Sequence, residues 1–178
     1  MYSNVLNFWL NELKPAMWWK KDAALDRRIA ERFGDVHAQA TRGELFNWRS
    51  SAQGRLAEII VLDQFSRNIF RDRPEAFAWD GMALVLAQEA LCAGADQGLS
   101  VDQCAFMYMP FMHSESLVIH EQAMLLFSAT GLESSLRIER RHKEILERFG
   151  RYPHRNDALG RPSTDAEIAF LKTPGSSF

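Results

Sequence analysis

The stretch SAQGRLAEIIVLDQFSRNIF, residues 51–70, decides the fold class. Its large apolar residues recur at helical spacing and share one face: Leu56, Ile59, Ile60, Leu62 and Phe65. Similar spacing continues through almost the whole chain, and no run alternates apolar and polar residues with β-branched enrichment. The sequence therefore predicts an all-α fold in which this segment is a long helix against the core.

Size and composition predict one domain. The chain has 178 residues, of which 47% are hydrophobic, enough for one sizeable core and too few to require two. We expect this domain to span residues 1–172, followed by a frayed tail at 173–178.

The charge balance narrows the functional classes. A formal net charge of −2 and a pI near 6.2 argue against a protein that coats nucleic acid or an anionic membrane, since both require a basic face. Residues 1–13 lack the basic lead-in of a signal peptide, and no segment has membrane-spanning length.

Cys92 and Cys104 lie in apolar, helix-like surroundings without Cys-x-x-Cys spacing. They predict two buried, reduced thiols in a cytoplasmic protein, with a disulfide as the less favoured alternative.

Caps and breakers divide the chain into helices. Ser3 and Asp22 are expected N-caps, and Thr164 with Glu167 fits a capping box. The segments predicted to be helical are 3–13, 22–34, 35–41, 51–70, 74–94, 100–110, 114–130, 132–150 and 164–171. Pro110 is expected to stop or kink its helix, and the five Trp are expected to lie largely in the core.

The tetrapeptide Glu-Arg-Phe-Gly occurs twice, at residues 31–34 and 147–150. It could be the trace of a duplication. The favoured interpretation is simpler, because an apolar residue before a glycine is how many amphipathic helices end. Both copies are therefore predicted to be helix ends.

The end of the 51–70 segment carries a polar stripe inside an otherwise apolar run: Asp63, Gln64, Arg67, Asn68 and Arg71. Charged residues spaced by four share one helical face, so a solvated ion-pair ladder would explain part of the pattern. The two amides extend the stripe beyond what a ladder needs. A partly buried ligand-binding face is the equally weighted alternative.

A histidine follows the Met- and aromatic-rich run 107–112. His113 lies beside apolar groups and near Glu115, the surroundings that tune an imidazole for acid or base chemistry. Ser114 and Glu115 also suit a helix cap and a first-turn acid. That second interpretation leaves His113 unexplained.

The segment RFGRYPHRN, residues 148–156, combines arginine, imidazole, an aromatic ring and an amide where a helical pattern stops. Such side chains are typical of anion recognition and exceed what a plain connection needs. Residues 137–161 contain eight basic and four acidic side chains, so the local charge is positive. A solvated face and a pocket for a small anion are equally favoured here, ahead of nucleic acid or a protein partner.

Signatures of metal sites and common enzymes are weak or missing. Glu139 and His142 have the Glu-x-x-His spacing of di-iron bundles, but no second copy accompanies them. No phosphate loop, dinucleotide fingerprint, nucleophile elbow or zinc-protease motif occurs. The sequence thus predicts no metal, names no cofactor and leaves open whether a reaction is catalysed.

In these motifs the chain resembles DUF924, a family of bacterial proteins of unknown function. The matching stretches run in order through nearly the whole chain: 5–9 with 18–19, 31–34, 62–65 with 67–71, 76–78 with Asp80, 113–115, 148–156, 159–161 and 163–164. The resemblance implies a TPR-like array of antiparallel helical hairpins. It brings no activity, substrate or cofactor. Ser66, where the family pattern often has Pro, and Leu25, where it often has an aromatic residue, depart from it without touching the polar groups.

The leading hypothesis is a pocket for a small phosphate- or carboxylate-bearing anion. Its expected ligand-binding residues are Asp63, Gln64, Arg67, Asn68, Arg71, Glu115, His142, Arg148, Arg151, Arg155, Asn156 and Arg161. His113 and His154 are the candidate acid/base groups. We expect the 63–71 face and the 148–156 loop to meet, with too few carboxylates nearby to neutralise their arginines. The alternative is a scaffold whose groove binds a peptide or protein.

Overall fold

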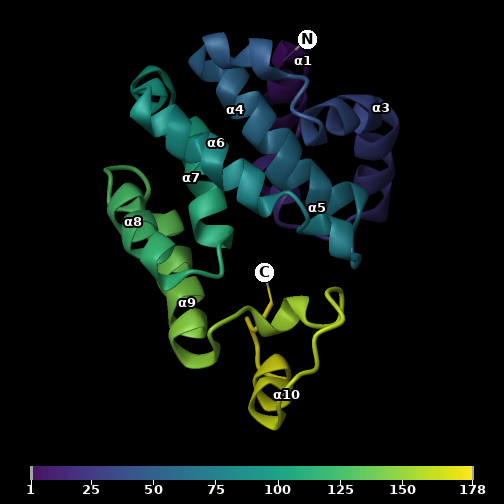
Figure 1. Ribbon diagram of the computed structural model, residues 1–178, viewed down its shortest axis with the longest axis vertical. Coiled ribbons are helices and arrows are strands. Elements are labelled where there is room, and N and C mark those ends of the chain that lie inside the picture. Colours follow the sequence, from purple (N-terminus) through teal and green to yellow (C-terminus); the bar gives the residue numbers. More distant parts are fainter. Residues whose placement is uncertain (1, 178) are drawn as a thin grey trace.

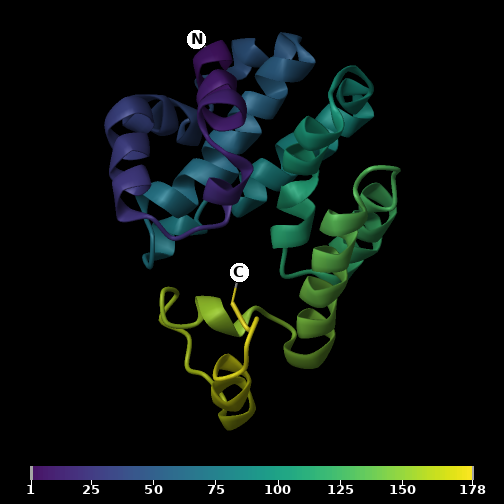
Figure 2. The ribbon, with the colours of Figure 1, turned by 180° about the vertical axis from the view of Figure 1, so that it is seen from behind.

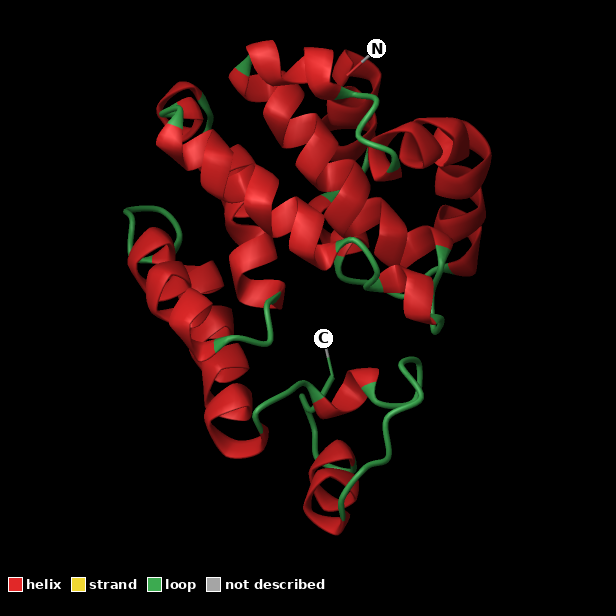
Figure 3. Ribbon diagram, viewed as in Figure 1, coloured by secondary structure: helices red, strands yellow, loops and turns green. Residues whose placement is uncertain are grey.

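The computed structural model describes residues 2–177, and within that range the chain is helical with no strand (Figure 3). The prediction of an all-α fold is confirmed. The main helices are α1 (Tyr2–Leu6), α2 (Pro15–Trp18), α3 (Ala23–Thr41), α4 (Ala52–Ile60), α5 (Ser66–Ile69), α6 (Asp80–Cys92), α7 (Val101–His113), α8 (Leu117–Phe127), α9 (Glu133–Phe149) and α10 (Asp165–Leu171). Shorter turns are the π-helical η1 (Asn7–Glu12) and η3 (Val61–Phe65) and the 3₁₀ turns η2 (Phe46–Ser50), η4 (Pro74–Ala76), η5 (Ala95–Gly98) and η6 (Pro153–Arg155).

Helix α4 is the centre of the main core. It packs against α1, α6 and α7 (Figures 1 and 2). The segments that follow α4, η3 and α5, contact α3. Aromatic rings of Phe8, Phe33 and Phe65 meet there at centroid distances of 5.0 to 6.2 Å. The predicted helical face of residues 51–70 is buried at all five positions.

Helices α8 and α9 extend the array, and α10 lies beyond the last turn of α9 (Figures 1 and 2). A second, smaller core forms there from Ile145, Leu146 and Tyr152, with Phe149 and Phe170 packed against it. The segment between α9 and α10, which holds η6, therefore contributes Tyr152 to this small core.

A π-helical turn interrupts the 51–70 helix at residues 61–65, and all five of its side chains are buried. Single π turns inside α-helices often occur at functional sites. This turn places Asp63 and Gln64 inside the protein, so the polar stripe is a buried feature at that point.

Several predicted helix boundaries are wrong because tertiary packing overrides local signals. Helix α3 runs uninterrupted through Gly34, since His37 and Ala40 continue its buried face. The second copy of the tetrapeptide does end a helix, with Gly150 at φ 69°. Pro110 is buried inside α7, and Ser3 lies within α1 and is not its cap.

Other helix starts differ as well. The predicted helix from Pro74 divides into a 3₁₀ turn and α6, and α8 begins at Leu117, after the predicted Ser114. The caps at Asp22 and Thr164 are confirmed.

The tryptophans and cysteines are more exposed than predicted. Trp9 and Trp48 are buried, but Trp19 is 62% exposed because it lies on the short connection after α2. Cys92 is exposed at the end of α6, and Cys104 is half-buried. Both are free thiols, so the expected reduced state holds in the structure and the expected burial is wrong.

The segment after α10 turns back toward α9. Ser176 Oγ donates to the carbonyl of Leu171 at 3.0 Å, and Arg141 donates to that of Gly175 at 3.3 Å. The predicted tail, 173–178, ends at Phe178, which lies outside the described residues. Among residues 2–177, no helix has the length and apolar composition needed to cross a membrane.

Candidate functional site

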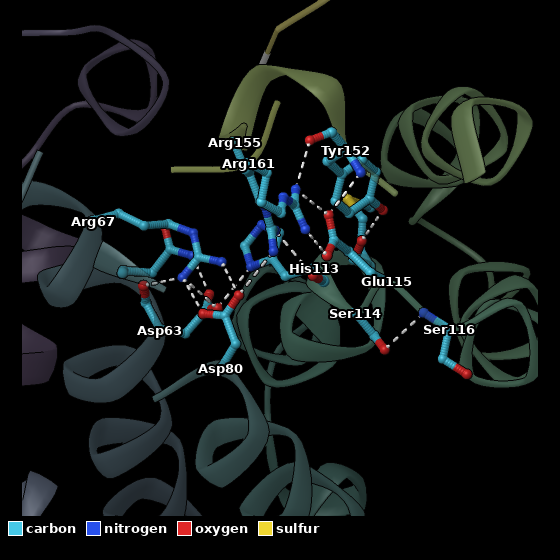
Figure 4. Close-up of polar contacts among 12 residues, drawn as sticks. Asp63, Arg67, Asp80, His113, Ser114, Glu115, Ser116, Tyr152, Arg155 and Arg161 are labelled. Atoms are coloured by element: carbon cyan, nitrogen blue, oxygen red, sulfur yellow. Dashed lines mark hydrogen bonds and ion pairs between the residues drawn. The ribbon is translucent and has the colours of Figure 1, made fainter. Parts of the chain in front are cut away.

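A buried carboxylate meets a histidine where η3 faces the end of α7. Asp63 Oδ1 lies 2.6 Å from His113 Nδ1, and the Asp63 side chain is only 1% exposed (Figure 4). Gln64 donates to the other oxygen of Asp63 and lies 3.3 Å from Met109 Sδ. Neighbours on two elements therefore fix the carboxylate, and the carboxylate orients the ring.

Two arginines share a second carboxylate beside this pair. Arg67 on α5 donates to both oxygens of Asp80 at 2.9 Å and to the Asp63 carbonyl at 2.7 Å. Arg155 in η6 donates to Asp80 Oδ2 at 3.1 Å and to the His113 carbonyl at 2.9 Å. The Phe77 ring lies under both guanidinium groups, at 5.6 and 4.7 Å. We call Asp63, Arg67, Asp80, His113 and Arg155 the central network.

The two guanidinium groups are compensated unequally. Burial opposes the charge of Arg67, yet Asp63 and Asp80 raise its pKa above the ordinary value. For Arg155, burial and the nearby Arg67 lower the pKa. Arg155 is only 6% exposed, and its Nε is buried without a hydrogen-bond partner among the described residues. Arg155 is thus a buried cation with unused donor capacity.

The acidic and imidazole groups are also shifted. Burial raises the pKa of Asp63, but Arg67 and His113 outweigh it and hold that pKa well below its usual range. Burial and the Arg67 charge lower the pKa of His113 despite the Asp63 carboxylate. Asp63 is therefore ionised and His113 neutral at physiological pH.

A second set of contacts fixes the loop that carries Arg155. Glu115 accepts two hydrogen bonds from Arg161, at 2.7 and 2.9 Å, and one from the backbone N–H of Tyr152 at 2.7 Å. Arg161 also donates to Asn156 Oδ1 at 3.0 Å, and Asn156 is 1% exposed. The loop is held to the α7–α8 connection by these bonds, so Arg155 is positioned rather than free.

Tyr152 is the buried centre of this part of the molecule. Its hydroxyl donates to the Met112 carbonyl at 2.7 Å and lies 3.1 Å from His120 Nε2. His120 Nε2 also lies 2.9 Å from the Ser114 carbonyl, and Nδ1 lies 2.5 Å from Glu139 Oε1. A carbonyl can only accept, so Nε2 carries the hydrogen. Burial raises the pKa of Glu139 despite the nearby His120 ring.

The structure brings together most of the residues predicted for the site, as the convergence of the 63–71 face and the 148–156 loop requires. Around the central network lie Gln64, Glu115, His142, His154, Asn156 and Arg161. The His142 and His154 rings pack on Tyr152 at 5.5 and 5.6 Å. Burial lowers the pKa of each to about 3, His154 with a contribution from Arg155. Neither titrates near neutrality, which leaves His113 as the acid/base candidate.

Four predicted residues lie elsewhere. Asn68 and Arg71 turn to Asp26 on α3, with distances of 2.6 to 2.8 Å. Arg151 forms a bidentate pair with Glu167, the capping-box residue of α10. Arg148 is exposed and stacks on Phe149 and Phe170. Their contacts are structural.

The expected shortage of carboxylates is wrong. Asp26, Asp80, Glu115 and Glu167 each pair with an arginine of the predicted set. The sequence interpretation failed because all four acids lie at helix starts or in a loop, and only the fold brings them near these arginines. The central network has two formal positive and two negative charges when His113 is neutral.

Sequence reasoning missed two features of the site. Asp80 had a usable signal, since it follows Phe77 by three residues in a matched motif, but nothing local showed that it bridges two arginines. Tyr152 was noted only as an interleaved aromatic, although it is fully buried. Away from the site, His37 donates from Nε2 to Ser66 Oγ at 2.8 Å, because that hydroxyl donates to the Leu62 carbonyl.

The site has an open edge. Side chains of Arg67, Asp80 and His113 are 20%, 18% and 16% exposed. No group of three or more His, Cys, Asp or Glu among residues 2–177 is arranged to hold a metal. The arrangement suits hydrogen bonding to an acceptor-rich molecule and proton exchange at His113.

Fold and site together define an all-α protein with a buried Asp–His pair and a shared Arg–Asp–Arg bridge. The chain belongs to the family described as bacterial protein of unknown function (DUF924), whose model matches residues 5–175.

A solved structure supports the same assignment. A protein of unknown function from Agrobacterium tumefaciens is 38% identical, with a TM-score of 0.89 and 96% of each chain covered. A comparison with curated proteins gives no match.

Proposed function

We propose that the protein binds a small ligand through a phosphate or carboxylate group at the open edge of the central network. The observation that carries the proposal is the Arg67–Asp80–Arg155 bridge, in which two guanidinium groups share one carboxylate and Arg67 and Asp80 reach the surface with 20% and 18% exposure. A bound anion would accept hydrogen bonds at this edge and add negative charge beside two guanidinium groups that share one carboxylate. The unequal compensation of the two arginines supports the same conclusion.

Ligand binding along a TPR-like groove is the weaker alternative. The described residues form a concavity of about 480 Å³ beside α10, lined by Arg148, Phe149, Arg151, Thr164, Ala166 and Glu167. Another of about 240 Å³ lies between η1 and the start of α7. Both are local hollows, whereas a peptide groove would follow successive hairpins. The central network therefore remains the better-supported site.

The test is thermal unfolding in phosphate against chloride at constant ionic strength. A ligand at about one hundred times its Kd stabilises the native state by about 2.7 kcal/mol. For a chain of this size that raises Tm by about 5 to 10 °C. Arg67→Gln should remove the phosphate response.

Arg71→Gln is the matched control, because Arg71 lies in the turn just after α5 and has a bidentate pairing with an Asp like that of Arg67. It should keep the full response. Equal phosphate responses in the two variants would refute the assignment of the site.

A further inference from the structure

We infer that His113 is a general base, which takes a proton at Nε2 from an O–H group held beside the bound anion. The inference rests on the proposed function, since it requires an anionic ligand at the central network. The O–H group belongs to the ligand or to a water molecule next to it, which is the same chemistry for the base.

The tautomer of His113 follows from its partner. Asp63 is ionised, so its oxygens only accept, and the 2.6 Å contact with His113 Nδ1 requires a hydrogen on that nitrogen. In the neutral ring the lone pair is then on Nε2. This is the arrangement in which a carboxylate orients a histidine base and stabilises the imidazolium that forms.

Nε2 is the available nitrogen. No hydrogen bond of the described residues uses it, and it is not among their buried polar atoms that lack a partner. The ring is 16% exposed, at the edge where Arg67 and Asp80 also reach the surface. A ligand anchored at this edge would lie against Nε2.

The orienting carboxylate is itself immobilised. Gln64 donates to Asp63, and Arg67 Nη1 lies 3.1 Å from Asp63 Oδ1. Arg155 donates to the backbone carbonyl of His113, so a hydrogen bond links the anion-binding guanidinium directly to the residue that carries the base (Figure 4). The geometry therefore couples anion capture to proton transfer.

Two other histidines lack this combination. His37 donates its Nε2 hydrogen to Ser66, and His120 uses both nitrogens in contacts with Glu139 and Ser114. Among these three, only His113 has one nitrogen paired with a low-pKa carboxylate and the other at an exposed edge.

The transfer leaves the site balanced in charge. The proton moves from the O–H oxygen to Nε2, which leaves an oxyanion on the donor and an imidazolium that faces the Asp63 carboxylate, so the net charge is unchanged. Around the ring lie Asp63 on η3, Arg67 on α5, Asp80 on α6 and Arg155 on η6, with His142 and His154 close by. The cations disfavour imidazolium, so the base regains its neutral form readily.

Alkylation with iodoacetate and iodoacetamide tests both parts of the inference. The Nε2 lone pair attacks the methylene carbon, the C–I bond breaks and iodide leaves. The two reagents differ in charge, and Cys92, exposed at the other end of α6 from Asp80, reports their intrinsic rate ratio in the same sample. Peptide mass spectrometry locates the products.

We expect His113 to be carboxymethylated at Nε2, with a preference for iodoacetate over iodoacetamide that exceeds the Cys92 ratio about tenfold. Phosphate should protect His113 without protecting Cys92. Asp63→Asn should slow the reaction about tenfold, because an amide no longer stabilises the developing imidazolium. Wild-type protein alone decides the outcome if that variant does not fold.

The contrary outcomes separate the two claims. An unmodified His113 in a protein that phosphate still stabilises would overturn the base and leave the anion site standing. Modification of His113 with the Cys92 ratio and without phosphate protection would overturn the anion site, and with it the inference built on it.

Discussion

Removing the charge of Asp80 isolates the energetic role of the central network. In Asp80→Asn, Arg155 would keep only a neutral acceptor where it now has a carboxylate, and its side chain is 7% exposed. Removing one partner of a buried ion pair costs about 3 to 5 kcal/mol, because the remaining charge is left without compensation. We therefore expect a loss of stability in that range.

Asp26→Asn is the matched control. Asp26 and Asp80 both lie in the first turn of a helix and both accept a bidentate arginine. Their side chains are 15% and 18% exposed. The helix-dipole contribution is therefore similar in the two variants. Arg71, the partner of Asp26, is 27% exposed and can be hydrated, so its loss of a counter-charge should cost only about 1 kcal/mol.

Urea denaturation at neutral pH and low salt measures both variants against wild type. The difference between them should be about 2 kcal/mol or more, and phosphate should recover part of the loss in Asp80→Asn only. Equal destabilisation of the two variants would refute the view that the Arg155 site is under-compensated.

Three further predictions concern the histidines, Tyr152 and the repeated tetrapeptide. Burial lowers the pKa of His37 to about 4 and of His142 to about 3, so the unfolded chain binds protons first and stability falls as pH drops below the ordinary 6.5. At two pH units below 6.5, each of these two histidines should lower the free energy of unfolding by about 2.7 kcal/mol. Denaturation across the pH range measures this loss, and a flat stability profile would contradict it. Tyr152→Phe removes a buried donor to a carbonyl and should cost about 1 to 2 kcal/mol by urea denaturation, a neutral result being the contrary outcome. Gly34→Ala should stabilise by up to about 1 kcal/mol inside α3, whereas Gly150→Ala should destabilise by about 1 kcal/mol at φ 69°; shifts of the same sign in calorimetry would be the contrary result.

Helical periodicity was enough to predict the fold class, because the spacing of apolar residues such as Leu56 and Phe65 shows which helix face is buried. Local signals failed where packing decides. Gly34 looks like a helix end, yet the buried residues after it keep α3 intact, and Pro110 is accepted inside α7 because its ring fills the core. Glycine and proline disfavour the interior of a helix, but tertiary contacts can outweigh that preference.

The site was predictable in composition and unpredictable in pairing. Asp63, His113 and Arg155 could be selected as polar groups in apolar or loop surroundings. The bridge through Asp80 could not, since Arg155 lies 75 residues away from it in sequence. Arg71 follows Arg67 by four residues, yet α5 ends at Ile69, and Arg71, in the turn after it, pairs with Asp26 on α3. Which carboxylate neutralises which arginine depends on the packing of helices and leaves no local pattern.

Anomalous diffraction from a crystal grown with tungstate tests the central claim most directly, because tungstate resembles phosphate and its position is read from the metal. We expect one tungstate within hydrogen-bond distance of Arg155, with His113 Nε2 facing it. Tungstate bound only beside Arg148, or an unoccupied edge at the central network, would contradict the claim.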